Sequence, residues 1–404
     1  IIGRNSSQSQ QASANDGDRF KWDLANLLLE KLKDHEGPQQ GSSPPSMPEM
    51  PGITRSDLPG IIFSDGPSSA ECFRKLPEIL EALYLNDYVA VHKVRWEPAG
   101  SDKIFAQKRL SLVEKYGFES EALIHLRLHH PNIVQCLCAF VDDSKCGYIL
   151  MEHMDTNLSR YITGRGPNNR MSLAEQVYVM LQIAKGMQYL HTKEIIYRDL
   201  KPENVLITDS RIVAAQSDPL GANTSGSPPV QQPELCESIQ VKIADFNFVK
   251  TIKNPIYPDS LESGTNKVGT AYYRAPEVME DRERLKYSKE VDVYSFGAVC
   301  FMMFLIGTDA FENGKSTLER IQTRRRSSRS LNELKGKCPL YLQRCIESWL
   351  NPNPKARPKF KDICRVLRHL YSVVVRSRSE SLPPFLSQPV DENTWRWVQE
   401  KVIM

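Results

Sequence analysis

The octapeptide YRDLKPEN, residues 197–204, brings an aspartate, a lysine and an asparagine together within eight positions. A segment with helical periodicity ends directly before it, and the strand-like sequence VKIADF follows at residues 241–246. A lone Arg-Asp pair is usually a surface ion pair. The ordered string of functional groups between a helix and a strand favours a chemical site instead.

The chemistry that these groups suit is phosphoryl transfer. This reaction asks little covalent chemistry of a protein, but it needs a base that orients the attacking hydroxyl, ligands for a metal ion on the phosphates, and cations where negative charge develops. Asp199 suits the base, and Lys201 suits a cation beside the transferring phosphate. Asn204 and Asp245, 41 positions apart, suit the metal ligands.

Together these motifs resemble the protein-kinase family, in which Asp199 would lie in the catalytic loop and Tyr197 replaces the usual histidine. Three further blocks stand in the order that the family shows: GTAYYRAPE at 269–277, DVYSFG at 292–297 and NPNPKARP at 351–358. The resemblance covers about residues 76–374 and implies that Arg357 pairs with Glu277. It gives structural or regulatory roles to Arg198, Phe246, Thr270, Glu277, Asp292 and Arg357.

The resemblance implies an α+β, two-lobed protein-kinase fold at residues 71–374, with a small antiparallel β N-lobe that carries one main helix and a larger, mostly helical C-lobe. Residues 1–70 are rich in Ser, Gln, Asn, Gly and Pro, and we expect this segment to be mostly disordered. We expect an amphipathic helix in the first part, and this helix and the C-terminal tail to dock on the domain or on a protein partner. The expected boundaries are 1–70 for the N-terminal segment with its helix near 18–33, about 76–154 and 155–374 for the lobes, about 211–238 for an insert, and 375–404 for the tail.

Two lysines compete for the role of holding the nucleotide phosphates. A strand at 104–110 makes Lys108 the lysine of the family's motif, and Glu121 lies thirteen residues further on, in the helix that would supply its ion-pair partner. Glu119 is the alternative partner. We expect Lys93 to point away, because an offset of one residue on a strand turns a side chain to the opposite face.

Two departures from the family concern glycine. The phosphate-covering turn at 84–89 reads YLNDYV, so all three glycines of G-x-G-x-x-G are absent, and a Cβ there hinders close approach of backbone N–H groups to phosphate. Asn247 replaces the glycine that would follow Asp245 and Phe246; asparagine tolerates left-handed backbone better than other non-glycine residues. These changes keep a second hypothesis open, a pseudokinase scaffold with weak or no catalysis.

The resemblance implies a kinase of intracellular signalling that uses ATP and Mg²⁺. Lys201 follows Asp199 by two positions, which resembles serine/threonine kinases rather than tyrosine kinases. Its substrate would be a protein with a Ser or Thr hydroxyl. A phosphate on the segment 245–277 would be bound by the Arg198 guanidinium and would regulate the kinase. Blocks such as HHPNIV at 129–134 resemble the tyrosine-kinase-like group, particularly its plant-type and Roco-type members. The implied ATP pocket consists of Leu83, Val91, Ala106, Lys108, Met151, Glu152, Met154 and Leu206.

Composition limits the expected partners and the expected cellular compartment of the protein. The chain has 52 Lys and Arg against 49 Asp and Glu, and this net charge of +3 argues against nucleic acid as a partner. The apolar run 298–306 is far shorter than the ~20 residues that cross a bilayer, so we expect no membrane span. Nine cysteines without disulfide spacing predict reduced thiols in the cytoplasm or nucleus. Because the chain starts at Ile1 rather than Met, we expect it to be part of a longer protein.

Overall fold

The computed structural model describes residues 77–96, 103–111, 118–141, 146–165, 170–211, 238–251, 273–279, 288–309, 334 and 336–376. The helix expected near 18–33, most of the insert expected at 211–238, Thr270 and the tail beyond residue 376 lie outside these residues. The chain divides into two compact units, with the division after His153.

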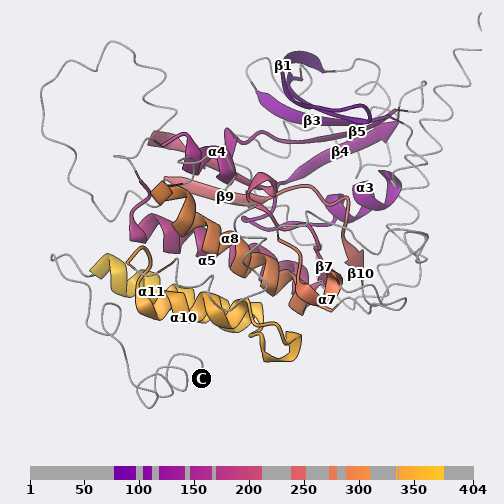
Figure 1. Cartoon of the computed structure of the whole chain (residues 1–404). Coiled ribbons are helices and arrows are strands. Elements are labelled where there is room, and N and C mark those ends of the chain that lie inside the picture. Colours follow the sequence, from indigo (N-terminus) through magenta and orange to yellow (C-terminus); the bar gives the residue numbers. More distant parts are fainter. Residues whose placement is uncertain are drawn as a thin grey trace, which may run out of the picture. The chain divides into compact units, whose positions relative to one another are not determined.

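The first unit is an antiparallel sheet with one helix, drawn in indigo to purple in Figure 1. Its sheet has the order β1-β2-β3-β5-β4, and Trp96 packs edge-on against Phe105 in the core at a ring distance of 6.3 Å. A Cβ on Gly147 would lie 2.5 Å from the Phe118 ring, so only glycine lets the helix start approach the sheet this closely. The elements are β1 Glu78–Leu85, β2 Val89–Arg95, β3 Ile104–Leu110, α3 Phe118–Leu126, β4 Cys136–Val141 and β5 Gly147–Glu152.

The second unit is mostly helical, with α11 packed on α5 and α10 packed on α8 (Figure 1). Two small sheets, β6-β8-β9 and β10-β7, carry the loops described below. The elements are β6 Thr156–Asn157, α4 Leu158–Thr163, α5 Leu173–Thr192, β7 Ile195–Ile196, η2 Pro202–Asn204, β8 Val205–Asp209, β9 Ile239–Ile243, β10 Lys250–Thr251, α7 Pro276–Met279, α8 Glu290–Asp309, α10 Leu340–Trp349, η6 Pro354–Ala356 and α11 Phe360–Arg376. A sheet unit and a helical unit confirm the predicted α+β class.

Helix α8 is the buried centre of the second unit. Its apolar residues from Ala298 to Leu305 are at most 4% exposed, which is the pattern of a helix covered on all sides. A Cβ on Gly297 would lie 3.0 Å from the Trp349 side chain, so glycine brings α8 close to α10. Among the described residues, no helix combines the length and the apolar character needed to cross a membrane.

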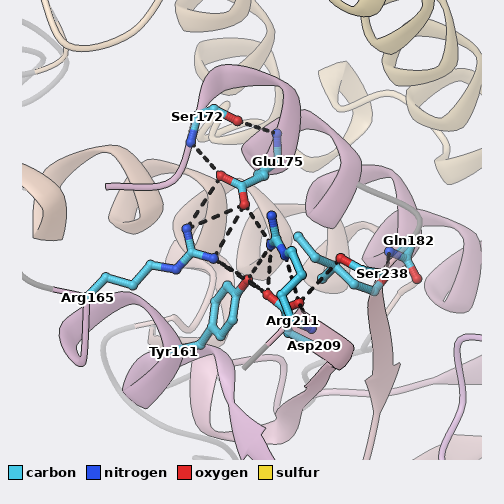
Figure 2. A network of polar contacts seen from close by, with 9 residues as sticks. Tyr161, Arg165, Ser172, Glu175, Gln182, Asp209, Arg211 and Ser238 are labelled. Carbon is cyan, nitrogen blue, oxygen red and sulfur yellow. Dashed lines mark hydrogen bonds and ion pairs between the residues drawn. The ribbon is translucent and has the colours of Figure 1, made fainter. Parts of the chain in front are cut away.

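A polar network ties β8 to α4 and α5 where the expected insert begins (Figure 2). The Asp209 carboxylate is 2% exposed and accepts hydrogen bonds from Tyr161 Oη and Arg211 Nη2, each at 2.7 Å. Arg211 Nη2 also donates to Glu175 Oε1 at 2.8 Å, and Arg165 reaches both Tyr161 and Glu175. Two guanidinium groups and two carboxylates thus balance one another, which compensates for their desolvation.

We expect Asp209→Asn to lower the free energy of unfolding by about 1–3 kcal/mol at pH 7, because a neutral amide accepts weaker hydrogen bonds from Arg211. Burial raises the pKa of Asp209, but hydrogen bonds from Arg211 and Tyr161 outweigh it and hold the pKa below its usual value. The stabilisation is therefore complete above the unfolded-state pKa of about 4 and is lost as the pH falls through the lower folded-state pKa. Urea unfolding from pH 7 to pH 3 measures both effects.

The matched control is Glu78→Gln, because Glu78 forms an exposed ion pair with Arg95 at 2.9 Å. An exposed ion pair contributes about 0–1 kcal/mol, so the free energy of unfolding of this variant should be close to that of the wild type. A penalty for Asp209→Asn that is the same at pH 3 and pH 7 would show that lost charge is not the cause.

Candidate active site

The loop that carries Asp199 is held by one buried carboxylate. Asp292, in the first turn of α8, is 0% exposed and accepts from the backbone N–H groups of Tyr197 at 2.9 Å and Arg198 at 2.8 Å. His191 Nε2 lies 2.8 Å from the same carboxylate. Arg198 has φ of +69°, a left-handed conformation that a non-glycine residue adopts only when its surroundings impose it. Asp292 thus fixes the backbone just before Asp199.

The Asp199 carboxylate is oriented by its own loop. It is 3% exposed, and its Oδ2 accepts from Lys201 Nζ at 2.8 Å and from Asn204 Nδ2 at 3.0 Å. Asn204 Nδ2 also donates to the Asp199 backbone carbonyl at 3.0 Å. The Asp199 side chain is therefore fixed before any substrate arrives, which is what a residue that orients a hydroxyl requires.

Asn204 and Asp245 are neighbours because β8 pairs with β9. Val205 pairs with Ile243, and Ala244 N donates to the Asn204 carbonyl at 2.9 Å, which places Asp245 next to Asn204. The Asn204 nitrogen is used by Asp199, so its Oδ1 is the atom left to face a cation, and Asp245 adds a carboxylate. Oxygen donors suit a hard divalent ion such as Mg²⁺ that also binds phosphate oxygens, so these residues fit a metal. Among the described residues, no group of three His, Cys, Asp or Glu side chains could hold a metal alone.

Tyr197 does more than keep an aromatic ring in place of histidine. It is 0% exposed, stacks edge-on against Phe246 at 5.8 Å, and donates its hydroxyl to the Ala244 carbonyl. Burial, followed by the nearby Asp245 and Asp199 charges, raises the pKa of Tyr197 well above its usual value, so the hydroxyl keeps its proton. The hydroxyl thus links the two motifs, a contact that the sequence interpretation missed.

The segment after Asp245 differs from the expectation for Asn247. The left-handed residue there is Asp245, with φ of +59°, and Asn247 is not among the described non-glycine residues with positive φ. Left-handed tolerance therefore does not explain the asparagine. The Asn247 Oδ1 atom is buried without a hydrogen-bond partner within the described residues. The next residue, Phe248, accepts a hydrogen bond at its carbonyl from Arg198 Nε at 2.5 Å.

The lysine of the first unit forms a buried ion pair. Lys108 Nζ on β3 lies 2.6 Å from Glu121 Oε1 on α3, and the two side chains are 6% and 3% exposed. The expectation that Lys93 points away is wrong: Lys93 pairs with Ala106, and paired residues share a sheet face, so Lys93 lies on the face of Ala106 and Lys108. Cross-strand register, not the offset along one strand, decides this. Lys93 is only half-buried, and burial with Glu121 distinguishes Lys108.

Several residues of the expected ATP pocket share that face. Val91 pairs with Lys108, and Met151 pairs with Ala106, whereas Glu152 pairs with Phe105 on the opposite face. The Glu152 side chain is used within the unit, because its Oε1 accepts from Gln135 N at 2.6 Å. Leu83 lies on β1 beside a register shift in the pairing with β2. In the second unit Leu206 lies on β8, and Met154 Sδ accepts from Thr208 on the same strand.

Glu277 and Arg357 form a two-pronged ion pair in the second unit. Arg357 Nη1 and Nη2 lie 2.6 and 2.8 Å from the two Glu277 oxygens, and the arginine side chain is 0% exposed. The guanidinium also lies over the Tyr294 ring at 5.0 Å. This pair joins α7 to the segment after η6, as the resemblance implied.

Comparisons with known proteins show which family the chain resembles. A family model described as "protein kinase domain" matches residues 94–371. The chain is 29% identical over 379 residues to a light-sensor protein kinase of Ceratodon purpureus, which covers 86% of this chain and 25% of that protein. It is 31% identical over 201 residues to an Aurora kinase of Candida glabrata, with 49% and 44% covered. It is 27% identical over 251 residues to the serine/threonine/tyrosine-protein kinase HT1 of Arabidopsis thaliana, with 62% and 54% covered.

The chain spans between a quarter and just over half of the length of these relatives. The family uses ATP, a divalent metal ion and protein substrates. Since the family model covers more than half of the sequence, this chain belongs to the protein kinase family.

Proposed function

We propose that the protein is a serine/threonine kinase that transfers the γ-phosphoryl group of ATP to Ser or Thr hydroxyls with the help of Mg²⁺. The observation that supports this most strongly is the buried Asp199 carboxylate, held by Lys201 and Asn204 at hydrogen-bond distance. A scaffold without catalysis has no need for this pre-set geometry.

Each polar residue has a role in the proposed reaction. Asp199 orients the substrate hydroxyl and accepts its proton, while Lys201 stabilises the charge on the transferring phosphoryl group. Asn204 and Asp245 would hold the metal, which, when bound, neutralises charge on the phosphates. Lys108, kept in place by Glu121, binds phosphate oxygens.

The finer parts of the proposal concern substrate and setting. Lysine two positions after Asp199 favours Ser and Thr over Tyr as acceptors. We place the protein in intracellular signalling, in the cytoplasm or nucleus, within the tyrosine-kinase-like group. Phosphorylation of the segment 245–277 would act through Arg198, and the terminal segments would bind protein partners.

A pseudokinase is the second candidate function. The absence of all three glycines at positions 84, 86 and 89 and the presence of Asn247 favour it. Such a protein would keep the fold and bind partners without efficient transfer.

Binding and transfer measured together separate the two candidates. A kinase should be stabilised against heat by ATP with Mg²⁺ and should label a pool of Ser and Thr peptides in preference to Tyr peptides. No stabilisation and no labelling would overturn the proposal. Stabilisation without labelling would assign the chain to the pseudokinases.

We expect Lys108→Met to lower kcat/KM for ATP by about 100-fold, because it removes the cation that meets the phosphates. The variant also removes the ion-pair partner of the buried Glu121 carboxylate, and breaking a buried pair in this way destabilises a protein by about 3–5 kcal/mol. The double variant Lys108→Met/Glu121→Gln removes both charges and isolates the catalytic effect.

Lys93→Met is the matched control, since Lys93 lies on the same sheet face but is only half-buried. Steady-state kinetics at varied ATP should show a small effect for Lys93→Met. Equal losses in the two single variants would remove Lys108 from its proposed role.

A further inference from the structure

The turn between β1 and β2 is closed by a side chain. Asn86 Oδ1 accepts hydrogen bonds from the backbone N–H groups of Tyr88 at 2.9 Å and Val89 at 2.7 Å. The backbone of Asn86 adds a third bond, because its N–H donates to the Val89 carbonyl at 2.9 Å. Three hydrogen bonds from one residue thus fix the tip of this hairpin.

This turn stands where the family carries its glycine-rich loop. Glycine allows successive backbone N–H groups of such a loop to surround phosphate oxygens. Here two successive N–H groups already surround an oxygen, and that oxygen belongs to the protein itself. A phosphate can use these donors only by displacing the Asn86 carboxamide. Its hydrogen bonds then replace those of Asn86, so the net gain in binding free energy is small.

Tyr84 secures the orientation of the carboxamide. Asn86 Nδ2 donates to Tyr84 Oη at 3.0 Å, which satisfies the nitrogen and leaves the oxygen toward the turn. Tyr84 and Asn86 stand at the first two glycine positions of the motif, so the two substitutions act together. Tyr84 pairs with Val91, which in turn pairs with Lys108, so this contact lies on the sheet face that carries the lysine.

We propose that the Asn86 carboxamide is an internal substitute for a nucleotide phosphate, which occupies the amides of the turn and reduces the preference of the protein for ATP over AMP. The proposal rests on the proposed function, since it concerns the nucleotide of that same site. Within the first unit, affinity for phosphates then comes from Lys108, and the turn contributes little.

Titration calorimetry with ATP and with AMP, both with Mg²⁺, tests the proposal on the full chain. Asn86→Ala removes the acceptor and frees two N–H donors, so it should bind ATP about tenfold more tightly, a typical gain from hydrogen bonds to a charged group. Binding of AMP should change by less than about twofold, because AMP lacks the outer phosphates. Asn86→Asp keeps the acceptor and adds negative charge, so it should bind ATP more weakly than the wild type.

Hydrogen exchange provides a readout without nucleotide. The amides of Tyr88 and Val89 should exchange about tenfold faster in Asn86→Ala than in the wild type, and remain protected in Asn86→Asp. If these two amides are unprotected in the wild type, the proposal that the Asn86 carboxamide takes the place of a phosphate is wrong, whatever the nucleotide measurements show. If the wild type binds ATP but Asn86→Ala leaves the ratio of ATP to AMP affinity unchanged, this inference fails and the proposed kinase function stands. If neither protein binds ATP, both fail.

Discussion

Asp199→Asn should lower kcat by about 10²–10⁴ while ATP still binds with unchanged affinity, because general-base assistance contributes a rate factor of this size. The amide has nearly the shape of the carboxylate, so the loop keeps its position, but it cannot accept the proton of the hydroxyl. Lys201 loses its ionic partner, but its side chain is 22% exposed and still reaches solvent.

Single-turnover transfer to a Ser or Thr peptide, with ATP binding measured in parallel, tests this prediction. Asp362→Asn is the matched control: it makes the same change to a half-buried carboxylate on α11 and should keep full activity. Equal rates in the wild type and Asp199→Asn, both above background, would show that another group accepts the proton. A wild type that binds ATP but transfers nothing would favour the pseudokinase.

The polar residues of the candidate site in the second unit could be predicted from the sequence, because phosphoryl transfer requires a base, metal ligands and a cation, and few residue types can supply them. Asp199 and Asn204 lie five positions apart, and one tight loop brings them within 3.0 Å. Asp245 follows a strand that pairs with the strand after Asn204, so local order along the chain is enough to place both. The roles assigned to these residues remain predictions until activity is measured.

Contacts made across the fold could not be predicted in the same way. The bond between Tyr197 N and Asp292 joins residues 95 positions apart and depends on where α8 packs. The face of Lys93 depended on the pairing of β2 with β3, which a single strand does not reveal. The sequence shows Asn86 only as a missing glycine, since its three hydrogen bonds within the turn arise from the turn geometry.

Asp292→Ala should lower the free energy of unfolding by about 3–5 kcal/mol, because it removes the acceptor of a buried and of a part-buried backbone N–H group. The carboxylate receives two backbone N–H groups, from Tyr197 and Arg198, and contacts His191. Of these, Tyr197 is itself 0% exposed, so water cannot replace the lost acceptor without opening the core. Urea unfolding measures the loss.

Ser295→Ala on the same helix is the control, since the Ser295 hydroxyl makes a neutral hydrogen bond to the Tyr273 carbonyl at 2.8 Å, a bond that contributes about 1 kcal/mol. Below its unfolding transition, Asp292→Ala should also show faster amide exchange at Tyr197 and Arg198, and a lower kcat with unchanged ATP affinity, because the backbone before Asp199 is no longer held. If Asp292→Ala unfolds like Ser295→Ala and keeps its activity, then Asp292 does not position the catalytic loop, and the left-handed conformation of Arg198 must be imposed by other contacts.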